Sequence, residues 1–526
     1  MAMPSSGAQA GSGMRMAQVL GALSLATDLG MAQPLGHVLR TCYIALRIGR
    51  ELKLAESELA ILYYATLLMH SGCPASSSLM AALVRTDEMD ATREVNRHAY
   101  GSPLQEIEAL AQHVAPEAPL LLRLQYILQA VTHAPRSKRE TQIGTCEVGA
   151  LMARRLGMPA GVEQTLQHLY EHWDGSGYHH LSGEQIPLCA RIVDPASVLE
   201  ILNEVGGHAA METVARAQRG KVLAPDVADA FLALTRNARF WQELSSDDLP
   251  LLLLEMEPNN PYQYIAPARF DEVVLAFAHF ADAKSVATLG HAADTAQMAE
   301  AIARRMGLVA DDITTIRRAA LLHDLGLVAI GVNLIEKRGS LTPAEQEKVR
   351  LHPYYTERIL SSVPGLQAVA PIAGGHHEWL NGQGYYRGLS GQAVPLGARI
   401  LAVADAFSEL TEGYPGHPAR ERDDAFRALA PQVGSQLAPE CYEALAQVLS
   451  LRLPLSAQRR ELPAGLTERE VQVLQLVAKG WTNRQVADQL GLSQKTVGHH
   501  VEHIYNKIGV STRAAAVFYA LEHELI

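Results

Sequence analysis

The two stretches of sequence that decide the organisation of the chain are near-copies of each other. DGSGYHHLSGEQIPLCARI spans residues 174–192, and NGQGYYRGLSGQAVPLGARI spans residues 381–400. A match of this length, with Gly-x-Gly-Tyr followed by Pro-Leu-x-Ala-Arg-Ile, indicates an internal repeat. The chain has 526 residues. At roughly 150 residues per domain it holds about three domains, so two related blocks leave room for a third.

Upstream of each repeat, histidines recur in the same order. A histidine preceded by a glycine opens a predicted helix in both blocks, His37 in the first and His291 in the second. Another histidine then follows an apolar segment, His70 in the first block and His323 in the second. The separation between this histidine and the repeat is longer in the first block. The first block therefore contains an insertion or a diverged middle.

Helical periodicity dominates the sequence and predicts an all-α fold. Apolar residues recur at i, i+3, i+4 and i+7 in segments such as AQMAEAIARRMG (296–307) and REVQVLQLVAKG (469–480). The chain is 48% hydrophobic and 19% charged, a composition that indicates a soluble globular protein and excludes disordered, collagen-like and membrane classes. The formal net charge is -11, so no chain-wide field attracts nucleic acid and any DNA contact requires a local module.

Two polar, proline-containing stretches divide the chain into three blocks. EPNNPYQYIAP occupies residues 257–267 and RELPAG occupies residues 460–465, and such clusters mark linkers. The small residues at the start of the sequence predict a disordered tail. The expected divisions are a tail at 1–14, a first block at 15–256, a linker at 257–268, a second block at 269–455, a linker at 456–465 and a third block at 466–526.

Cysteine usage and hydropathy favour a reducing cytoplasm. The five cysteines are scattered and show no CxxC spacing, which argues against a disulfide framework or a zinc knuckle. The apolar stretch 16–31 resembles a signal peptide, but Asp28 interrupts it, so we interpret it as an opening helix. Because no apolar run reaches the ~18 residues of a membrane span, we expect a cytoplasmic protein with no membrane partner.

The second block gathers imidazole and carboxylate groups at predicted helix ends. A lone histidine on an apolar helix is usually a satisfied core residue, but this many groups in one block favour a metal site. Imidazole nitrogen suits zinc, iron, manganese and nickel, and a carboxylate between two ions can bridge them. Paired ions can hold a hydroxide nucleophile and stabilise the attacking and leaving oxygens of a phosphate ester. The candidate ligands are His291, His323, Asp324, His352, His376, His377 and Asp405.

With these residues, the second block resembles the HD-GYP family, helical metal-dependent phosphohydrolases linked to hydrolysis of the bacterial second messenger cyclic di-GMP. The resemblance covers about residues 269–453. It rests on short motifs spread over that whole range. They are Asp282, Lys284, HDLG at 323–326, LTPAEQEKVRLHP at 341–353, HHEW at 376–379, GQGYY at 382–386 and VPLGARILAVADAF at 394–407.

The resemblance implies a centre of two divalent transition metals, either iron, manganese or zinc. One metal would take His291, His323, Asp324 and Asp405, and the other would take Asp324, His352, His376 and His377. Asp324 would bridge the two ions and is the candidate catalytic residue. The candidate substrate-binding residues are Gly384, Tyr385 and Arg399.

Four positions depart from the family pattern. The family's lysine after HDxG is Leu327 here, which removes a cation that would neutralise a scissile phosphate, so we expect slow or no turnover. Tyr386 stands in the proline position of the GYP motif, and Asn381 stands where aspartate is usual. Ala287 stands where some members have a glutamate for a third metal, so two ions are the expected maximum.

The first block keeps the predicted scaffold and loses the ligands. Ser71 replaces the bridging aspartate, and Leu169-Tyr170 stand where the paired histidines belong. Ser197 occupies the place of the last aspartate. Without an anionic bridge two cations cannot sit close together, so we interpret the first block as a degenerate HD-GYP repeat that serves packing or ligand sensing. A retained regulatory pocket is the alternative.

The third block divides into four predicted helices with clear boundaries. Thr467 followed by Glu470 forms a capping pattern, and Gly480 suits the position after a helix end. Thr482 or Asn483 caps the second helix. A short helix, a turn with a glycine and a longer helix form a helix-turn-helix. We expect Ser493 to cap the third helix, Ser511 to cap the fourth, and Val497, Val501, Ile504 and Ile508 to face inward.

This block resembles the LuxR-type helix-turn-helix over essentially its whole length, through LTEREVQVL, KGWTNRQVADQLGLS and KTVGHHVEHIYNKIGVSTRAAAV. The resemblance implies binding to duplex DNA, with the third helix in the major groove. Basic and acidic residues balance in residues 466–526, so a monomer should bind weakly and a homodimer should be needed. The candidate DNA-binding residues are Thr482, Asn483, Gln494, Lys495, Thr496, His499, His500 and Lys507.

Together these features predict a bacterial transcription regulator, and two hypotheses for the second block stay open. In one, the metal site senses a cyclic dinucleotide or another phosphoester with slow or no turnover. In the other, the second block is an active phosphodiesterase of the cyclic di-GMP class. Leu327 and Tyr386 favour the first hypothesis, whereas the complete ligand set favours the second.

Overall fold

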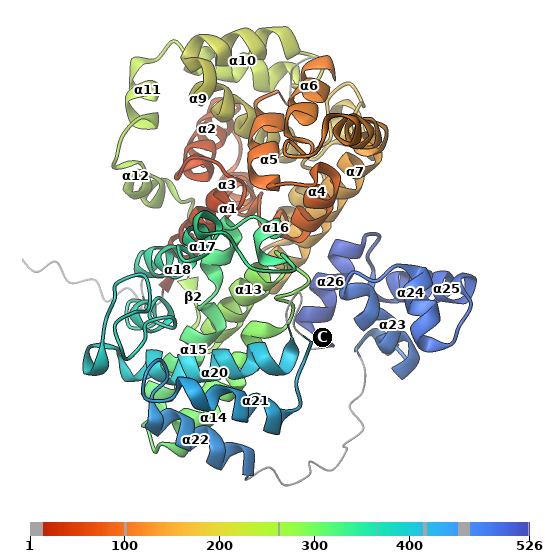
Figure 1. Ribbon diagram of the computed structural model, residues 1–526. Coiled ribbons are helices and arrows are strands. Elements are labelled where there is room, and N and C mark those ends of the chain that lie inside the picture. Colours follow the sequence, from red (N-terminus) through yellow and green to blue (C-terminus); the bar gives the residue numbers. More distant parts are fainter. Residues whose placement is uncertain are drawn as a thin grey trace, which may run out of the picture.

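The computed structural model of the protein describes residues 14–98, 103–260, 264–363, 365–413, 418–450, 463–523 and 525–526. Within these residues the chain is almost entirely helical, which confirms the predicted all-α class. Figure 1 shows two helical domains stacked one above the other, with a smaller third domain beside them. Residues 1–13 of the predicted tail and residues 456–462 of the predicted second linker lie outside the described residues.

The first domain consists of helices of very different length, of which α7 and α9 are the longest. Its elements are α1 (Met16–Gly30), α2 (His37–Glu51), α3 (Glu56–Leu68), η1 (Pro74–Ser76), α4 (Ser77–Val84), α5 (Glu88–Arg97), α6 (Pro103–His113), α7 (Leu120–Arg155), α8 (Ala160–Gln167), η2 (Gly183–Gln185), α9 (Ala190–Gln218), α10 (Pro225–Leu234), α11 (Ala238–Leu244) and α12 (Leu249–Met256). The segment that resembles a signal peptide forms α1, as predicted, and most of its residues are buried.

The second domain carries the metal-ligand candidates. Its elements are η3 (Pro267–Arg269), α13 (Phe270–Asp282), α14 (His291–Arg305), α15 (Ala310–Leu322), η4 (Leu325–Ala329), α16 (Val332–Ile335), α17 (Pro343–Val349), α18 (His352–Ser361), α19 (Ala370–Ala373), η5 (Gly391–Ala393), α20 (Leu396–Glu412), α21 (Arg422–Leu429), η6 (Ala430–Gln432) and α22 (Pro439–Ser450). Helix α14 packs against both α15 and α20, so these three helices form the centre of the domain.

The first two domains share one hydrophobic core. Strand β1 (Met14–Arg15) pairs antiparallel with β2 (Tyr264–Ile265), so Met14 lies in a strand and the predicted linker at 257–268 contains its partner. Helix α1 contacts η4 and α18 of the second domain as well as α3 and α12 of the first. One continuous set of buried apolar residues runs through both domains. Packing at the η4 segment therefore connects the first domain directly to the metal-ligand candidates.

The third domain contains η7 (Pro463–Gly465), α23 (Glu468–Ala478), α24 (Asn483–Leu490), α25 (Gln494–Ile508) and α26 (Arg513–Glu522). The predicted N-caps Thr467, Thr482 and Ser493 are confirmed, because each side chain accepts a hydrogen bond from the backbone N–H three residues on. The predicted cap at Ser511 is wrong. Thr512 caps α26 instead, accepting from the N–H of Ala515.

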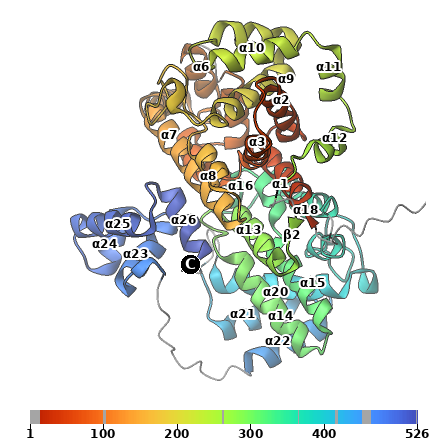
Figure 2. The same cartoon turned by 180° about the vertical axis from the view of Figure 1, so that it is seen from behind.

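Helix α26 fastens the third domain to the other two. It packs on α23 of its own domain and on α7, η1 and α13 of the first two domains. Figure 2, seen from behind, shows α26 at the side of α7 and α13, with α24 and α25 turned outward. None of the helices in the described part of the chain is long and apolar enough to cross a membrane.

Candidate metal centre

The seven predicted ligands converge from five helices and the segments that follow them. His291 is the first residue of α14, His323 and Asp324 follow α15, and His352 is the first residue of α18. His376 and His377 come shortly after α19, and Asp405 lies within α20. Gly290, with φ 84°, precedes His291 in the left-handed region and turns the chain sharply into the helix. Five of the seven side chains are almost inaccessible, with relative exposures of 6% or less.

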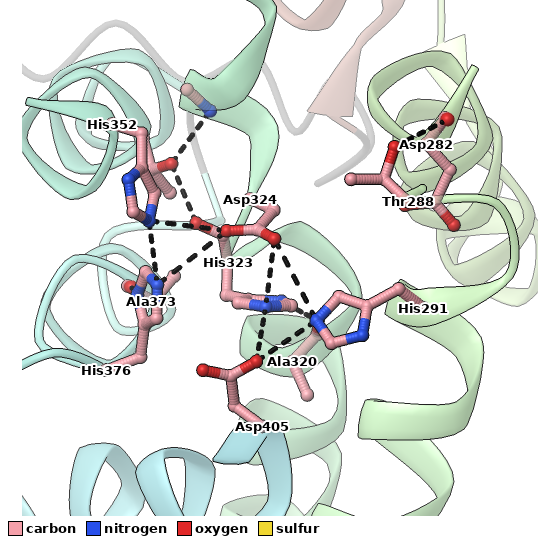
Figure 3. Close-up of polar contacts among 12 residues, drawn as sticks. Asp282, Thr288, His291, Ala320, His323, Asp324, His352, Ala373, His376 and Asp405 are labelled. Atoms are coloured by element: carbon pink, nitrogen blue, oxygen red, sulfur yellow. Dashed lines mark hydrogen bonds and ion pairs between the residues drawn. The ribbon is translucent and has the colours of Figure 1, made fainter. Parts of the chain in front are cut away.

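One half of the site pairs two imidazoles with two carboxylates. Nε2 of His291 lies 3.0 Å from Oδ1 of Asp405, and Nε2 of His323 lies 3.4 Å from the same oxygen. Oδ2 of Asp324 lies 3.4 Å from Nε2 of His323 and 3.9 Å from Nε2 of His291. Figure 3 shows these four side chains facing one point. They are the four residues predicted for the first metal.

The other half of the site is rich in histidine. Oδ1 of Asp324 lies 3.4 Å from Nε2 of His352 and 3.7 Å from Nε2 of His376, and these two nitrogens lie 3.1 Å apart. The ring of His377 lies 4.1 Å from that of His376, centroid to centroid. Asp324 therefore turns one carboxylate oxygen to each half (Figure 3). This is the geometry that a bridging carboxylate requires.

Backbone carbonyls set the orientation of three imidazoles. The Nδ1–H groups of His323, His352 and His376 donate to the carbonyl oxygens three residues earlier, at 2.7, 2.7 and 2.6 Å. His291 instead directs Nδ1 to Oε2 of Glu412, at 3.0 Å. A hydrogen bond at Nδ1 fixes the tautomer and aims Nε2 at a metal, which is the usual support for metal-binding histidines.

The two halves differ in their electrostatics. Burial lowers the pKa of His291, but hydrogen bonds to Asp405 and Glu412 outweigh burial and hold this pKa well above its ordinary value. Burial also opposes the charge of His323, yet Asp324 and Asp405 raise its pKa to about 9. In the other half burial prevails, and together with His352 it lowers the pKa of His377 to about 3. The carboxylates of the acidic half thus favour positive charge next to them, as they would favour a bound cation.

The residues present fit a pair of metal ions. Their Nε2 and carboxylate oxygen atoms form three overlapping groups, and within each group these atoms lie within 4.8 Å of one another. Nε2 of His323 is buried and has no hydrogen-bond partner, which is costly unless another group, such as a metal, satisfies it. Imidazoles and bridging carboxylates together suit iron, manganese or zinc. The three groups are His291, His323 and Asp324; His323, His376 and Asp405; and His352, His376 and His377.

A cavity of about 520 Å³ opens over the metal-ligand candidates. Tyr385 lines it, with its ring 4.8 Å from that of His377 and with the guanidinium of Arg350 5.3 Å above its centroid. Leu327 also lines the cavity, where the family resemblance predicts a lysine. Lys337 is the nearest substitute cation among the lining residues, but its Nζ lies 2.6 Å from a carboxylate oxygen of Glu345.

The structure brings only one of the three predicted substrate-binding residues to the cavity wall, Tyr385. Glycine is required at position 384 for packing, because a Cβ there would lie 2.4 Å from the carbonyl oxygen of His377. Arg399 is not among the lining residues, and its guanidinium lies 2.5 Å from a carboxylate oxygen of Glu440. The predicted role of Arg399 therefore gains no support from its placement.

Sequence reasoning missed two acidic residues of the site, Glu409 and Glu412. Both line the cavity, and Glu412 contacts His291. Burial, followed by the charge of Asp405, raises the pKa of Glu409 to about 8. Because these residues follow Asp405 by one and two helical turns, the i+4 and i+7 spacing on α20 was a signal that could have identified them.

Lys284, which is part of the family resemblance, lies outside the site. Its ammonium is 1% exposed and donates to Glu88 of the first domain at 2.9 Å. Glu88 also accepts from the backbone N–H of Val332. Lys284 therefore joins the two domains through a buried ion pair.

The first domain holds no comparable ligand cluster among the residues that the structure describes. Nδ1 of His37 bonds to Glu200, and its Nε2 lies 3.3 Å from the hydroxyl oxygen of Ser197. The ring of His70 stacks on that of His37 at 5.7 Å, and burial, with the charge of His37, lowers the pKa of His70 to about 3. The histidines of the first domain thus have protein partners instead of converging ligands.

The recognition helix of the third domain presents most of the predicted DNA contacts to solvent. Gln494, Lys495 and His499 on α25 are exposed, whereas Val497, Ile504 and Ile508 are buried as predicted. Thr482 is exposed, and Asn483, Thr496 and His500 are half-buried. Lys507, predicted to meet phosphate, instead donates to Glu470 at 2.7 Å and to the carbonyl oxygen of Gly465 at 3.0 Å.

Two known protein families match parts of this chain. Residues 276–440 match the HD domain family, and residues 464–520 match the LuxR family of bacterial regulatory proteins. The first match includes all seven ligand candidates, and the second includes the recognition helix. The protein therefore contains an HD domain with clustered histidine and aspartate residues and a C-terminal LuxR-family domain.

Two curated proteins illustrate the likeness. The "3'3'-cGAMP-specific phosphodiesterase 3" of Vibrio cholerae is 31% identical over 439 residues, 83% of this chain and 95% of the relative. The "Cyclic di-GMP phosphodiesterase response regulator RpfG" of Xanthomonas campestris is 39% identical over 146 residues, 27% of this chain and 39% of that protein.

A solved structure extends the likeness to the fold. The crystal structure of a cyclic GMP-AMP-specific phosphodiesterase of V. cholerae, V-cGAP3, superimposes with a TM-score of 0.59 at 28% identity, covering 84% of this chain and 99% of that one. An alignment of 439 residues is longer than the second and third blocks together, so it includes part of the first block as well. The chain therefore belongs to the HD-domain family that contains this V. cholerae phosphodiesterase 3.

Proposed function

We propose that this protein is a cytoplasmic, DNA-binding transcription regulator of LuxR type whose HD domain binds two divalent metals. In this proposal the HD domain senses, or slowly hydrolyses, a cyclic dinucleotide or another phosphoester. The observation that carries the proposal is Asp324, whose two oxygens face two separate sets of imidazoles. A histidine-rich site built around a shared carboxylate is suited to a pair of ions and, through them, to phosphate.

The chemistry of the site supports a phosphoester as ligand. Two divalent ions, when bound, would supply Lewis-acid stabilisation of a phosphate ester and activation of water. The protein contributes the cavity of about 520 Å³, which is within the range of small-molecule sites and large enough for more than a mononucleotide. Tyr385, which lines the cavity and has the guanidinium of Arg350 over its ring, offers an aromatic contact for a base.

The relatives narrow the substrate class to cyclic dinucleotides. The V. cholerae relative is named for 3'3'-cGAMP, and the X. campestris relative is named for cyclic di-GMP. We infer that the ligand of this chain belongs to the same class. Leu327 in the cavity wall and the pairing of Lys337 with Glu345 leave no unpaired lysine among the described lining residues, which supports slow turnover.

An active phosphodiesterase with a DNA-binding output domain is the second candidate function. The observation that favours it is the complete ligand set, because a site that only senses a nucleotide does not need seven converging ligands. The name of the V. cholerae relative points in the same direction. The two candidates differ in turnover and agree on metal and ligand.

In the same proposal the third domain binds duplex DNA, as a homodimer, through the exposed face of α25. The first domain is a degenerate repeat of the HD domain. Equivalent hydrogen bonds in the two domains support the interpretation of the first domain as a repeat. Glu171 accepts from the backbone N–H groups of His179 and Leu181 at 2.8 and 3.0 Å. Glu378 accepts in the same way from Arg387 and Leu389 at 2.6 and 2.7 Å.

The test is a metal analysis combined with a hydrolysis assay on the full chain, purified anaerobically under reducing conditions. We expect one to two transition metals per chain, and binding of 3'3'-cGAMP or cyclic di-GMP with slow cleavage or none. Rapid cleavage of either would establish the second candidate function. A metal-free protein that binds neither nucleotide would overturn both.

A further inference from the structure

A second cavity, of about 400 Å³, lies in the first domain, away from the metal-ligand candidates. Helices α4, α5, α6 and α7 enclose it, and its wall is mostly apolar. Met80, Met89, Leu110 and Val131 line it together with Tyr170, which stands where the repeat predicts a histidine. Apolar side chains and flexible methionines accommodate an apolar ligand body.

Two polar oxygens in this wall are buried without a partner. They are the side-chain oxygens of Thr141 and Gln142, on the stretch of α7 that faces the cavity. An unsatisfied buried oxygen is costly, so native proteins rarely keep one without a ligand or a water to satisfy it. The amide oxygen of Gln142 can only accept, and it therefore requires a ligand that donates.

The charged side chains that line this cavity already form ion pairs within the protein. Glu88 accepts from the buried ammonium of Lys284 at 2.9 Å, and Glu106 pairs with Lys138 at 2.8 Å. Burial raises the pKa of the Tyr170 phenol well above its ordinary value, so this group stays neutral. Because each acidic group here has its own cation, the cavity has no need of an ionic ligand.

These observations select one class of ligand. We propose that the cavity between α4 and α7 binds an uncharged, largely apolar small molecule that donates a hydrogen bond to Gln142, and that its occupancy alters the docking of the LuxR-family domain. The proposal is independent of the metal site. It gives the first domain a sensing role through a site of its own.

The docking part of the proposal rests on a shared helix wall. Thr141 and Gln142 face the cavity, and Gly144, a few residues on, faces the third domain. A Cβ at Gly144 would lie 3.2 Å from the Cβ of Ala514 and 3.6 Å from the hydroxyl oxygen of Ser76, which also lines the cavity. Gly144 thus lies close both to Ser76 of the cavity wall and to Ala514 of α26, so a movement of the wall at this point would reach α26.

The helices around the cavity are able to respond to a ligand. Their packing rests on a small hydrophobic cluster, separate from the continuous core of the molecule. A region held by few buried contacts opens and shifts at low cost. The members of this cluster are Val84, Ala91, Leu110, Val114, Ala115 and Ala130.

The first experiment titrates the full chain with N-phenyl-1-naphthylamine, a neutral apolar fluorophore with one N–H donor. We expect saturable binding of one probe per chain. Ala134→Phe, which fills the cavity, should abolish the signal. Gln142→Leu should weaken binding about tenfold, the effect of losing one buried hydrogen bond, whereas Gln125→Leu on the exposed face of α7 should not. A probe that lacks the N–H should bind wild type and Gln142→Leu equally.

The outcome that would overturn the site is specific. Leu120, Leu121 and Leu128 on α7 are exposed, and an apolar probe can adhere to them. Fluorescence that persists in Ala134→Phe, with unchanged metal content and thermal unfolding, would assign the probe to that surface and refute the cavity site.

The second experiment measures the effect of the probe on DNA affinity by fluorescence anisotropy. We expect the probe to change the affinity of wild type about fivefold or more, the lower end of typical coupling between two sites, and to leave Ala134→Phe unchanged. Saturable binding in the cavity without any change in DNA affinity would remove the docking part of the proposal.

Discussion

Asp324 is the residue on which the metal centre depends most. Its two oxygens lie 3.4 Å from His323 on one side and 3.4 Å from His352 on the other. Asp324→Ala removes a ligand from both halves, so we expect the metal content to fall from up to two ions per chain to one or none. Asp312→Ala, on the exposed first turn of α15, should retain the wild-type content. Mass spectrometry measures the metal content of wild type and of the two variants. Equal metal content in all three would refute the ligand assignment.

Leu327 sets the expected rate of hydrolysis. It lines the cavity next to the ligands and brings no charge to a bound phosphate. Leu327→Lys would place an ammonium there, and a cation aimed at developing charge accelerates such reactions by about tenfold or more. We therefore expect faster cleavage of 3'3'-cGAMP or cyclic di-GMP in a discontinuous chromatographic assay.

The matched control is Leu396→Lys, which adds the same charge at the exposed start of α20, outside the cavity. Its turnover should equal that of wild type. If Leu327→Lys and wild type both bind nucleotide and neither cleaves it, the enzyme candidate fails and the sensor candidate stands.

At the scale of the helix, sequence patterns predicted what local interactions determine. The caps at Thr467, Thr482 and Ser493 follow from side chains that bond within one turn, and all three are confirmed. The seven ligand candidates could be named because HD-GYP motifs mark them, although Asp405 lies within α20 and not at a helix end. At Ser511 the local rule failed, because two hydroxyl residues compete for the cap and Thr512 forms it.

Contacts between distant segments could not be predicted in this way. Strand β1 pairs with β2 and so joins residues 14–15 to residues 264–265, and no periodic pattern in the sequence predicts this pairing. Arg399 was chosen from its motif, yet Glu440 engages it outside the cavity. The docking of α26 on α7 is also non-local, and it depends on Glu147, which no motif marks.

Glu147 of α7 makes the polar contacts that hold the third domain against the first. Its carboxylate accepts from the N–H and hydroxyl groups of both Ser511 and Thr512, at the N-terminus of α26. A carboxylate there also complements the helix dipole. Glu147→Gln removes the charge from these bonds, which in general weakens such contacts by ~1 kcal/mol or more.

We therefore expect Glu147→Gln to free α26 from α7. The expected readouts are wider separation of spin labels on α7 and α24, and tighter DNA binding by the full chain. Glu140→Gln on the same helix removes only an exposed contact with Arg136 and should change neither quantity. Unchanged label distances in Glu147→Gln would show that the apolar contacts alone hold α26.

At the scale of the whole molecule, the docking of α26 would compete with the proposed dimerisation. The sequence suggests Ala515, Val517, Phe518 and Leu521 on α26 as a self-association surface. In the monomer Ala515, Phe518 and Leu521 are buried and Val517 is half-buried. Because α26 packs on α7, η1 and α13, a dimer through this face requires the third domain to detach. In the proposed function, this arrangement would couple the state of the first two domains to DNA binding.

The last prediction concerns the DNA complex. Residues 466–526 contain as many acidic as basic residues, so one copy gains little from counterion release, and two recognition helices one DNA turn apart must share the work. The fragment from Leu466 should bind duplex DNA weakly as a monomer, and the full chain should bind a two-fold symmetric site more tightly as a dimer.

Lys495→Ala, on the exposed start of α25, should weaken binding about tenfold and reduce the salt dependence by about one ion if it contacts phosphate. Lys479→Ala, exposed at the end of α23, should bind like wild type. Anisotropy titrations at several salt concentrations measure the DNA affinity and its salt dependence. If the full chain shows no salt-sensitive DNA binding, with or without metal and cyclic dinucleotide, the third domain is a protein interaction module instead.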